Sequence, residues 1–113
     1  MSPEQGAFRA LADPTRREIL KHLSRSDMTI AEVADLFDVT RGAIKKHLVI
    51  LEQGQLISVE AKGRERLNRL RPHGLKAATD WLSYFDRFWD DKLAALGQVI
   101  DAANSTKKDN DNE

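Results

Sequence analysis

The stretch DVTRGAIKKHLVIL, residues 38–51, predicts a capped, basic, amphipathic helix that runs from Arg41 to about Gln53. Thr40 is placed to act as its N-cap, because a hydroxyl there can accept a hydrogen bond from an amide of the first turn. Apolar and basic residues separate onto opposite faces at helical spacing. The inward face is expected to hold Ala43, Ile44, Leu48 and Leu51, and the outward face Arg41, Lys45, Lys46 and Val49.

Another helix pattern lies immediately before this one. Thr29 and Glu32 form a capping box, in which each side chain serves the backbone amide of the other residue. Apolar residues follow at helical spacing: Ile30, Val33, Ala34 and Phe37. Only residues 38–39 separate this helix from the Thr40 cap. Two short helices joined this closely must cross steeply, which is typical of a helix-turn-helix.

A β-hairpin is expected after the basic helix. Gly54 and Gln55 end that helix, and residues 56–60 then alternate as a half-buried strand. Residues 61–64 form a turn around Gly63, and residues 65–70 alternate as the second strand. A helix-turn-helix followed by a hairpin predicts a winged helix-turn-helix.

Two further helices are expected at the start of the chain. Ser2 and Pro3 have the pattern of one helix start, and Asp13 and Pro14 have the pattern of another. The second helix, residues 14–24, is expected to bury Ile19, Leu20 and Leu23 and to expose Arg16, Arg17 and Lys21.

One long helix is expected from Leu75 to about Ala103, because apolar residues recur there every three or four positions. Residues 104–113 lack apolar side chains and are predicted to be a disordered tail. The predicted fold class is mostly α with a small β-hairpin, in the order α-α-α-α-β-β-α. Residues 1–103 would form one DNA-binding domain with a dimerisation helix at each end.

The bulk composition fits a globular cytoplasmic protein. The chain has 113 residues and no Cys, so it contains no disulfide and no thiolate metal site. No apolar run approaches the ~20 residues that span a bilayer, and no signal peptide opens the chain, so no membrane partner is expected. Eighteen Lys and Arg balance eighteen Asp and Glu.

This neutral total conceals a strong regional difference in charge. Residues 41–71 hold eight Lys and Arg against three Asp and Glu, a net charge of +5. Residues 80–113 hold four against eight, a net charge of −4. A polyanion is therefore expected to meet the middle of the chain.

The basic helix and the hairpin are the expected contacts with double-stranded DNA. At ~20 Å the helix is long enough to lie in a major groove. Its start could hold a phosphate and its Arg could reach a guanine edge. The hairpin cations would contact the flanking backbone or minor groove, although they also suit a soluble edge hairpin. The predicted DNA-binding residues are Thr40, Arg41, Gly42, Lys45, Lys46, His47, Lys62, Arg64 and Arg66.

Five of the seven aromatic residues fall within residues 81–89. At ~150–250 Å² each they exceed what a small core can cover, and the surplus is near the ~800 Å² per partner of a standard interface. A two-fold homodimer is the leading interpretation. A pocket for a small organic effector, or a docking face of a winged helix used as a protein-interaction module, is the alternative. The expected dimer residues are Phe8, Leu11, Trp81, Leu82, Tyr84, Phe85, Phe88, Trp89, Leu93 and Leu96.

Neither a metal site nor catalysis is expected, and no cofactor is implied. The three His residues lie far apart, and Asp86 with Asp90 lacks a His partner. No nucleophile–base motif and no phosphate-binding glycine loop is present, so the protein is not expected to be an enzyme.

With these residues in view, the chain resembles the ArsR/SmtB family of bacterial transcriptional repressors over about residues 7–101. The resemblance rests on ALADPTRREIL at residues 10–20, VTRGAIKKHL at residues 39–48 and Gly63-Arg64-Glu65. The ending WLSYFDRFW at residues 81–89 looks like the metal-independent branch. This resemblance implies a dimer whose recognition helices enter successive major grooves of a palindromic operator.

The chain departs from the family at several positions. Residues 32–37 lack the cysteines of the metal-sensing helix, and the His/Asp pattern of the dimer-helix site is missing, so metal sensing is not carried over. Gln55 stands where the family usually has Gly, and Asn68 where it often has Tyr. Both are expected to affect local geometry rather than DNA binding.

Overall fold

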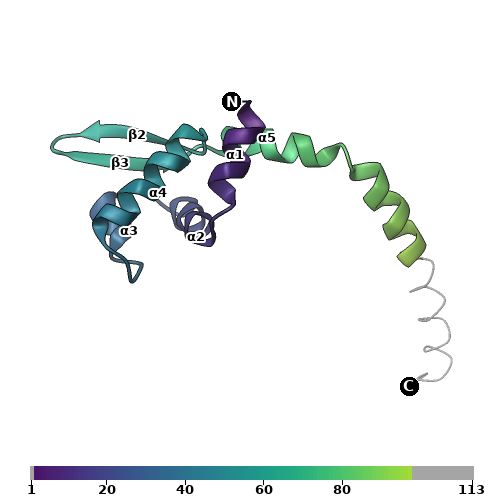
Figure 1. Cartoon of the computed structure of the whole chain (residues 1–113), viewed down its shortest axis with the longest axis horizontal. Coiled ribbons are helices and arrows are strands. Elements are labelled where there is room, and N and C mark those ends of the chain that lie inside the picture. Colours follow the sequence, from purple (N-terminus) through teal and green to yellow (C-terminus); the bar gives the residue numbers. More distant parts are fainter. Residues whose placement is uncertain (1, 98–113) are drawn as a thin grey trace, which may run out of the picture. The chain divides into compact units, whose positions relative to one another are not determined.

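The computed structural model describes residues 2–97, which fall into two compact units divided between Trp81 and Leu82. Five helices and three strands make up the fold up to Ser83 (Figure 1). They are α1 (Pro3–Leu11), α2 (Pro14–Leu23), β1 (Met28–Thr29), α3 (Ile30–Ala34), α4 (Arg41–Gln53), β2 (Ile57–Lys62), β3 (Glu65–Leu70) and α5 (Pro72–Ser83). The mostly helical fold with a basic helix followed by a hairpin is confirmed.

The first four helices begin where the sequence predicts, each with a side-chain cap. Ser2 Oγ accepts from the Gln5 amide at 3.2 Å, and Asp13 Oδ1 accepts from the Arg16 amide at 3.1 Å. The capping box at Thr29 is complete, and Thr40 Oγ1 accepts from the Ala43 amide at 3.1 Å. Each cap satisfies an amide that would otherwise lack a partner in the first turn of its helix.

The C-terminal end of α1 is held by side chains of α2. Arg16 Nε donates to the Ala10 carbonyl at 2.8 Å and its Nη2 to the Arg9 carbonyl at 3.0 Å. Arg17 Nη1 donates to the Leu11 carbonyl at 2.8 Å. These carbonyls lie in the last turn of α1, where no helical amide is available. The prediction that Arg16 points outward is wrong: Arg16 is half-buried, because its guanidinium reaches back over α1.

The sheet has three antiparallel strands in the order β1-β3-β2, and the sequence analysis missed β1. Met28 pairs with Asn68, and Thr29 pairs with Leu67. Asn68 is only 1% exposed and is the sole buried polar side chain among residues 2–97. Its Nδ2 donates to the Met28 carbonyl at 3.1 Å, so it ties β1 to the hairpin.

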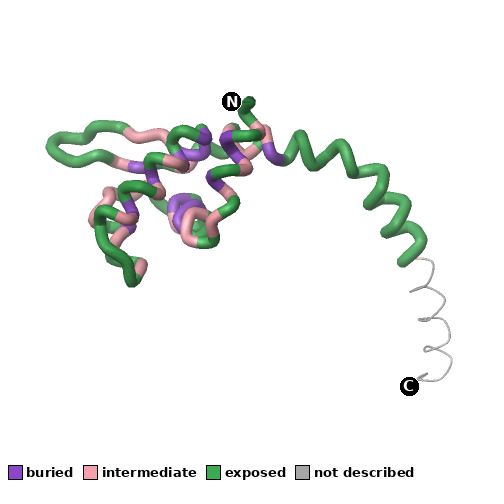
Figure 2. The backbone as a smooth tube through the Cα atoms, viewed as in Figure 1, coloured by how far each residue is buried: buried purple, intermediate pink, exposed green. Residues whose placement is uncertain are grey.

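The buried hydrophobic residues belong to α1, α2, α3, α4, the region around the start of β2 and the middle of α5. Figure 2 marks these buried positions along the backbone. The predicted inward residues Ile44, Leu48 and Leu51 of α4 are buried, whereas Ala43 is half-buried. A Cβ at Gly54 would lie 2.7 Å from the Gly6 carbonyl oxygen, closer than real Cβ atoms approach. The missing Cβ of Gly54 therefore lets the end of α4 touch the backbone of α1 at Gly6.

A Schellman motif ends α4. The Leu56 amide donates to the Leu51 carbonyl at 3.0 Å, and the Gln55 amide donates to the Glu52 carbonyl at 2.9 Å. Gln55 takes the left-handed conformation at φ 61°, a position that favours Gly. The expected geometric role of Gln55 is thus confirmed. The glycine of this turn is Gly54, one residue before Gln55, where the contact of α4 with α1 leaves no room for a Cβ.

Two segments end earlier than predicted. α3 stops at Ala34 and not near Phe37, because the Leu36 and Phe37 amides bond to carbonyls three residues back and tighten the turn. The long helix expected over residues 75–103 is also wrong, since a turn at residues 84–85 separates α5 from helical residues 86–97. Ser83 to Asp86 are all weak helix formers, so this stretch favours a break. Residues 98–113, including the predicted tail, lie outside the described residues.

Within residues 2–97, no helix is long and apolar enough to cross a membrane.

Replacing Gln55 with Gly is expected to raise the free energy of unfolding by about 0.5–1 kcal/mol, because Gly adopts the left-handed conformation without a Cβ penalty. Urea unfolding followed by circular dichroism measures this change. The matched control is Gln53→Gly, which alters the last helical residue and should lower stability by up to about 1 kcal/mol. A loss of stability in Gln55→Gly would show that the left-handed conformation carries no cost at this position.

Candidate nucleic-acid interface

The first turn of α4 presents a polar, open surface. Thr40, Arg41 and Gly42 are exposed, and Lys45 and Lys46 are exposed one turn later. A Cβ at Gly42 would meet only Thr40 Oγ1, at 3.9 Å, so packing does not require glycine there. The absence of a side chain at residue 42 instead leaves the backbone accessible to a large ligand.

A concavity of about 470 Å³ joins the starts of α3 and α4 to the tip of the hairpin. Its lining contains four cationic side chains and a single carboxylate, so it is strongly positive. The lining residues are Thr29, Ile30, Ala31, Arg41, Gly42, Lys45, Arg64, Glu65 and Arg66. Five of the nine predicted DNA-binding residues therefore meet at one surface: Arg41, Gly42, Lys45, Arg64 and Arg66.

The other four predicted DNA-binding residues do not line this concavity. Thr40 caps α4 at its edge, and Lys46 is exposed on the next position of the helix after Lys45. Lys62 ends β2 opposite Glu65 at the hairpin tip and is exposed. His47 is half-buried, and its Nδ1 lies 3.2 Å from Arg16 Nη1.

The sequence analysis missed the contribution of α3 to this surface. Thr29, Ile30 and Ala31 line the concavity beside the start of α4. The capping box at Thr29, which marks the start of α3, was the sequence signal that could have revealed this contribution. The two helices of a helix-turn-helix cross steeply, and this rule could have placed the start of α3 beside the start of α4.

One cation of the basic segment is paired with two carboxylates at the protein surface. Arg69 Nε donates to Asp27 Oδ2 at 2.8 Å, and Arg69 Nη2 lies 3.7 Å from Glu60 Oε2. The hydrogen bond that Arg69 donates to Asp27, and then the charges of Asp27 and Glu60, raise the pKa of Arg69. This network lies on exposed strand residues and fastens the hairpin to the loop before β1. The positive surface therefore depends on Arg41, Lys45, Arg64 and Arg66 rather than on all cations of residues 41–71.

Asp13 lies at the junction of α1 and α2, near His47 and Arg16. Partial burial raises the pKa of its carboxyl, but hydrogen bonds from the Arg16 and Thr15 amides and the charges of His47 and Arg16 outweigh burial and lower it. The carboxylate form is thus favoured, as a helix N-cap requires.

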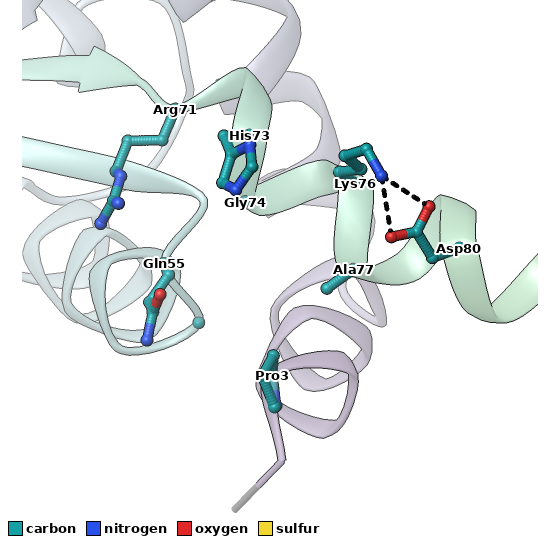
Figure 3. A pocket seen from close by; sticks show the side chains of 9 residues that line it. Pro3, Gln55, Arg71, His73, Gly74, Lys76, Ala77 and Asp80 are labelled. Atoms are coloured by element: carbon teal, nitrogen blue, oxygen red, sulfur yellow. Dashed lines mark hydrogen bonds and ion pairs between the residues drawn. The ribbon is translucent and has the colours of Figure 1, made fainter.

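A second concavity, of about 400 Å³, lies at the start of α5 (Figure 3). Arg71 and Lys76 bring positive charge to its lining, which also contains His73, and Lys76 Nζ pairs with both carboxylate oxygens of Asp80 at 3.1 Å. A Cβ at Gly74 would overlap the Gln55 carbonyl oxygen, so the two backbones are in direct contact. This concavity marks the close approach of α5 to the turn after α4. No predicted site residue lines it.

The apolar residues predicted for a dimer interface differ in their exposure. Phe8 and Leu11 are half-buried against the core, and the Phe8 ring meets the Trp81 ring edge-on at 5.5 Å. The remaining members of the set are 38–70% exposed: Trp81, Leu82, Tyr84, Phe85, Phe88, Trp89, Leu93 and Leu96. Among residues 2–97, no group of three or more His, Asp or Glu is arranged to hold a metal ion.

Comparisons with known proteins agree with this geometry. Residues 11–60 match a family model described as a helix-turn-helix domain. The HTH-type transcriptional regulator Rv2034 of Mycobacterium tuberculosis is 37% identical over 101 residues, which cover 89% of this chain and 91% of that protein. The transcriptional repressor SdpR of Bacillus subtilis is 36% identical over 86 residues, which cover 76% of this chain and 96% of that protein.

A solved structure extends the agreement to three dimensions. The crystal structure of the ArsR family transcriptional regulator RHA00566 is similar with a TM-score of 0.72 and 35% identity, covering 79% of this chain and 98% of that one. These relatives are transcriptional regulators rather than enzymes. Their similarity over most of both chains, together with the basic α4 and hairpin, shows that this chain belongs to the ArsR family of winged helix-turn-helix transcriptional regulators.

Proposed function

We propose that the protein is a homodimeric repressor that acts in the cytoplasm and binds a palindromic operator without a metal ion. The observation that supports DNA binding most strongly is the positive concavity between the start of α4 and the hairpin. Its cations come from two elements, α4 and the hairpin. The positive charge is therefore concentrated at one surface although the chain is neutral. Such a surface raises the local concentration of a polyanion.

α4 serves as the recognition helix. Its thirteen residues span ~20 Å, which fits the major groove. Arg41 stands in the first turn of α4, where the guanidinium can reach both acceptors of a guanine edge. Lys45 lies one turn further along the same exposed surface. The small Gly42 between them allows the helix backbone to approach the DNA.

Phosphate contacts come from the start of α4 and from the hairpin. The amides of the first helical turn have no carbonyl partner within the helix, and they favour an anion at this end. The Thr40 hydroxyl, which accepts from Ala43, can still donate its hydrogen to a phosphate oxygen. Lys46 adds a charge beside it, and Lys62, Arg64 and Arg66 contact the backbone on the flank.

The exposed aromatic residues support a dimer. Residues 81–96 leave Trp, Tyr, Phe and Leu side chains largely exposed, and contiguous apolar surface of this kind marks an interaction site. A two-fold dimer would bury these side chains against their copies and would present two copies of α4. Two recognition helices related by a two-fold axis read a palindrome.

Binding without metal follows from the residues available as ligands. The chain contains no Cys, and the described part of the structure has no group of three or more His, Asp or Glu side chains that could hold a metal ion. A site for a transition metal needs several such ligands converging at bonding distance. We therefore expect the regulatory signal to be something other than a metal ion.

The proposal predicts selective and chelator-insensitive binding to the promoter of the protein's own gene. Fluorescence anisotropy measures the affinity for this fragment and for scrambled DNA of the same composition, at several salt concentrations and with or without EDTA. Equal weak affinity for both DNAs would remove the operator-binding proposal and favour the protein-interaction module. If EDTA abolished binding and added metal restored it, the proposal that binding needs no metal would be contradicted, whereas operator binding itself would stand.

Arg41→Ala and Lys46→Ala are expected to weaken binding in different ways. Lys46→Ala should reduce affinity on all sequences and reduce the salt slope by about one unit, because one phosphate contact is lost. Arg41→Ala should cost about 1–3 kcal/mol on the operator and much less on scrambled DNA, because a base contact is lost. Equal losses on both DNAs for Arg41→Ala would show that Arg41 contacts phosphate only.

Sedimentation equilibrium at micromolar concentration is expected to give twice the 12.8 kDa mass of the chain. Phe88→Glu should give the single-chain mass, because a carboxylate would be buried without a partner in the interface. Asp90→Asn, a change at a neighbouring exposed polar residue, should remain dimeric and serves as the control. A monomeric wild-type protein would contradict the dimer and leave the aromatic face available to a different partner.

A further inference from the structure

A cavity of about 120 Å³, here named the α4–hairpin cavity, lies between α4 and one face of the hairpin. Its helical wall is a single stripe of α4, because the residues that form it stand at spacings of three, four and seven. They are Lys45, Leu48, Val49 and Glu52. Leu48 is buried, whereas the other three residues are exposed, so the cavity extends from the core to the surface.

The hairpin forms the opposite wall. Val59 of β2 pairs directly with Asn68 of β3, and Arg66 lies two residues before Asn68 in the same strand. Cross-strand partners, and residues two apart in one strand, point to the same side of a sheet. These three side chains therefore face the stripe of α4 together. Leu48, Val49 and Val59 make the middle of the cavity apolar.

The amide of Asn68 offers a hydrogen-bond acceptor to this cavity. Asn68 is 1% exposed, and its Nδ2 donates to the Met28 carbonyl at 3.1 Å, which fixes the orientation of the amide. Within residues 2–97, Asn68 Oδ1 receives no hydrogen bond. Every fully enclosed polar side-chain atom of these residues has a partner, so Oδ1 is not enclosed and reaches the cavity that Asn68 lines. A bound group that donates a hydrogen bond would satisfy it.

Two cations stand where the α4–hairpin cavity meets the positive concavity. Lys45 and Arg66 line both of them, and neither residue forms an ion pair within the described part of the chain. Glu52 lies seven residues after Lys45, ~10 Å further along α4, at the other end of the cavity. A bound carboxylate is therefore attracted to the end at Lys45 and repelled from the end at Glu52.

We propose that the α4–hairpin cavity binds a small organic effector, a monocarboxylic acid with an apolar body of about the size of a benzene ring and a hydrogen-bond donor opposite the carboxylate. The carboxylate pairs with Lys45 and Arg66, and the donor reaches Asn68 Oδ1. The apolar body packs between α4 and the hairpin. A cavity of ~150 Å³ accommodates benzene, so an open cavity of about 120 Å³ suits a group of this size.

Occupancy of this cavity opposes DNA binding. The inference rests on the proposed function, in which Lys45 and Arg66 contact DNA. The same two cations cannot pair with the carboxylate of the effector and with DNA at once, and the charge of the effector weakens the positive field of the surface. The effector therefore releases the repressor from its operator, and each ligand weakens the binding of the other by the same factor.

Isothermal titration calorimetry of the free protein tests the site without DNA. The probe is 4-hydroxybenzoate, whose hydroxyl lies across the ring from the carboxylate, and its Kd is expected to be on the order of 0.1–1 mM. Benzoate lacks the donor for Asn68 Oδ1 and is expected to bind about three- to tenfold more weakly. 4-Hydroxybenzyl alcohol lacks the carboxylate and is expected to bind at least about tenfold more weakly. Equal affinity for all three compounds overturns the inference.

Val49→Phe fills the cavity from α4. Val49 is 43% exposed, so a larger side chain can enter without displacing the core. This variant is expected to lower the affinity for 4-hydroxybenzoate at least about tenfold, and to keep the affinity for the promoter fragment within about twofold, which also shows that it is folded. Gln53→Phe, one turn later on α4 and outside the cavity lining, should leave both affinities unchanged. Unchanged affinity for the probe in Val49→Phe overturns the inference.

Lys45→Gln provides a second variant at an exposed position of α4. It is expected to lower the calorimetric affinity for 4-hydroxybenzoate about three- to tenfold and to leave the weak affinity for 4-hydroxybenzyl alcohol unchanged, because only the former has a carboxylate. Equal losses for the two compounds contradict the assigned orientation of the effector.

Competition with DNA is measured by fluorescence anisotropy at constant sodium concentration, because affinity for DNA depends on salt. At about ten times its Kd, 4-hydroxybenzoate is expected to raise the Kd for the promoter fragment about tenfold. 4-Hydroxybenzyl alcohol at the same concentration should not change it. An unchanged Kd for DNA with the probe bound overturns the inference. Failure of the proposed function is distinguishable, since the wild-type protein would then show no preference for the promoter, whereas calorimetry and competition on scrambled duplex at low salt would still decide the effector site.

Discussion

Two guanidinium groups of α2 hold the C-terminal end of α1, and the arrangement of the helical part depends on this contact. A helix as short as the nine residues of α1 is marginal on its own, so it needs tertiary support. Arg16 and Arg17 satisfy its last carbonyls, and the missing Cβ of Gly54 lets the end of α4 come close to its backbone. Because Arg16 also reaches His47, the same junction contacts α4.

The concavity between α4 and the hairpin shows how a neutral chain presents a positive face. Arg41 and Lys45 on α4 meet Arg64 and Arg66 on the hairpin at one concavity. Arg69 belongs to the same basic segment but is neutralised by Asp27 and Glu60, and it serves to hold the hairpin. Folding therefore divides the cations of residues 41–71 between stability and an exposed electrostatic surface.

The features that sequence reasoning predicted correctly are local ones. The caps at Ser2, Asp13, Thr29 and Thr40 need only the residue and the amide three positions later. The inward face of α4 follows from helical spacing alone. The features it missed depend on distant partners: β1 has two residues and exists only because Asn68, forty positions later, pairs with Met28. The helix predicted to be continuous after Leu75 breaks at residues 84–85, because apolar spacing does not detect a run of weak helix formers.

The amino-acid sequence by itself determined where the first four helices begin, which face of α4 is basic, and that a hairpin follows it, because these properties depend on contacts within a few residues. Tertiary structure alone decided that five of the nine predicted DNA-binding residues share one concavity and that the start of α3 lines it. It also turned Arg16 from an expected surface cation into a half-buried link between α1 and His47. Such outcomes depend on the distances between elements far apart in the chain, and only the packing of helices and strands sets those distances.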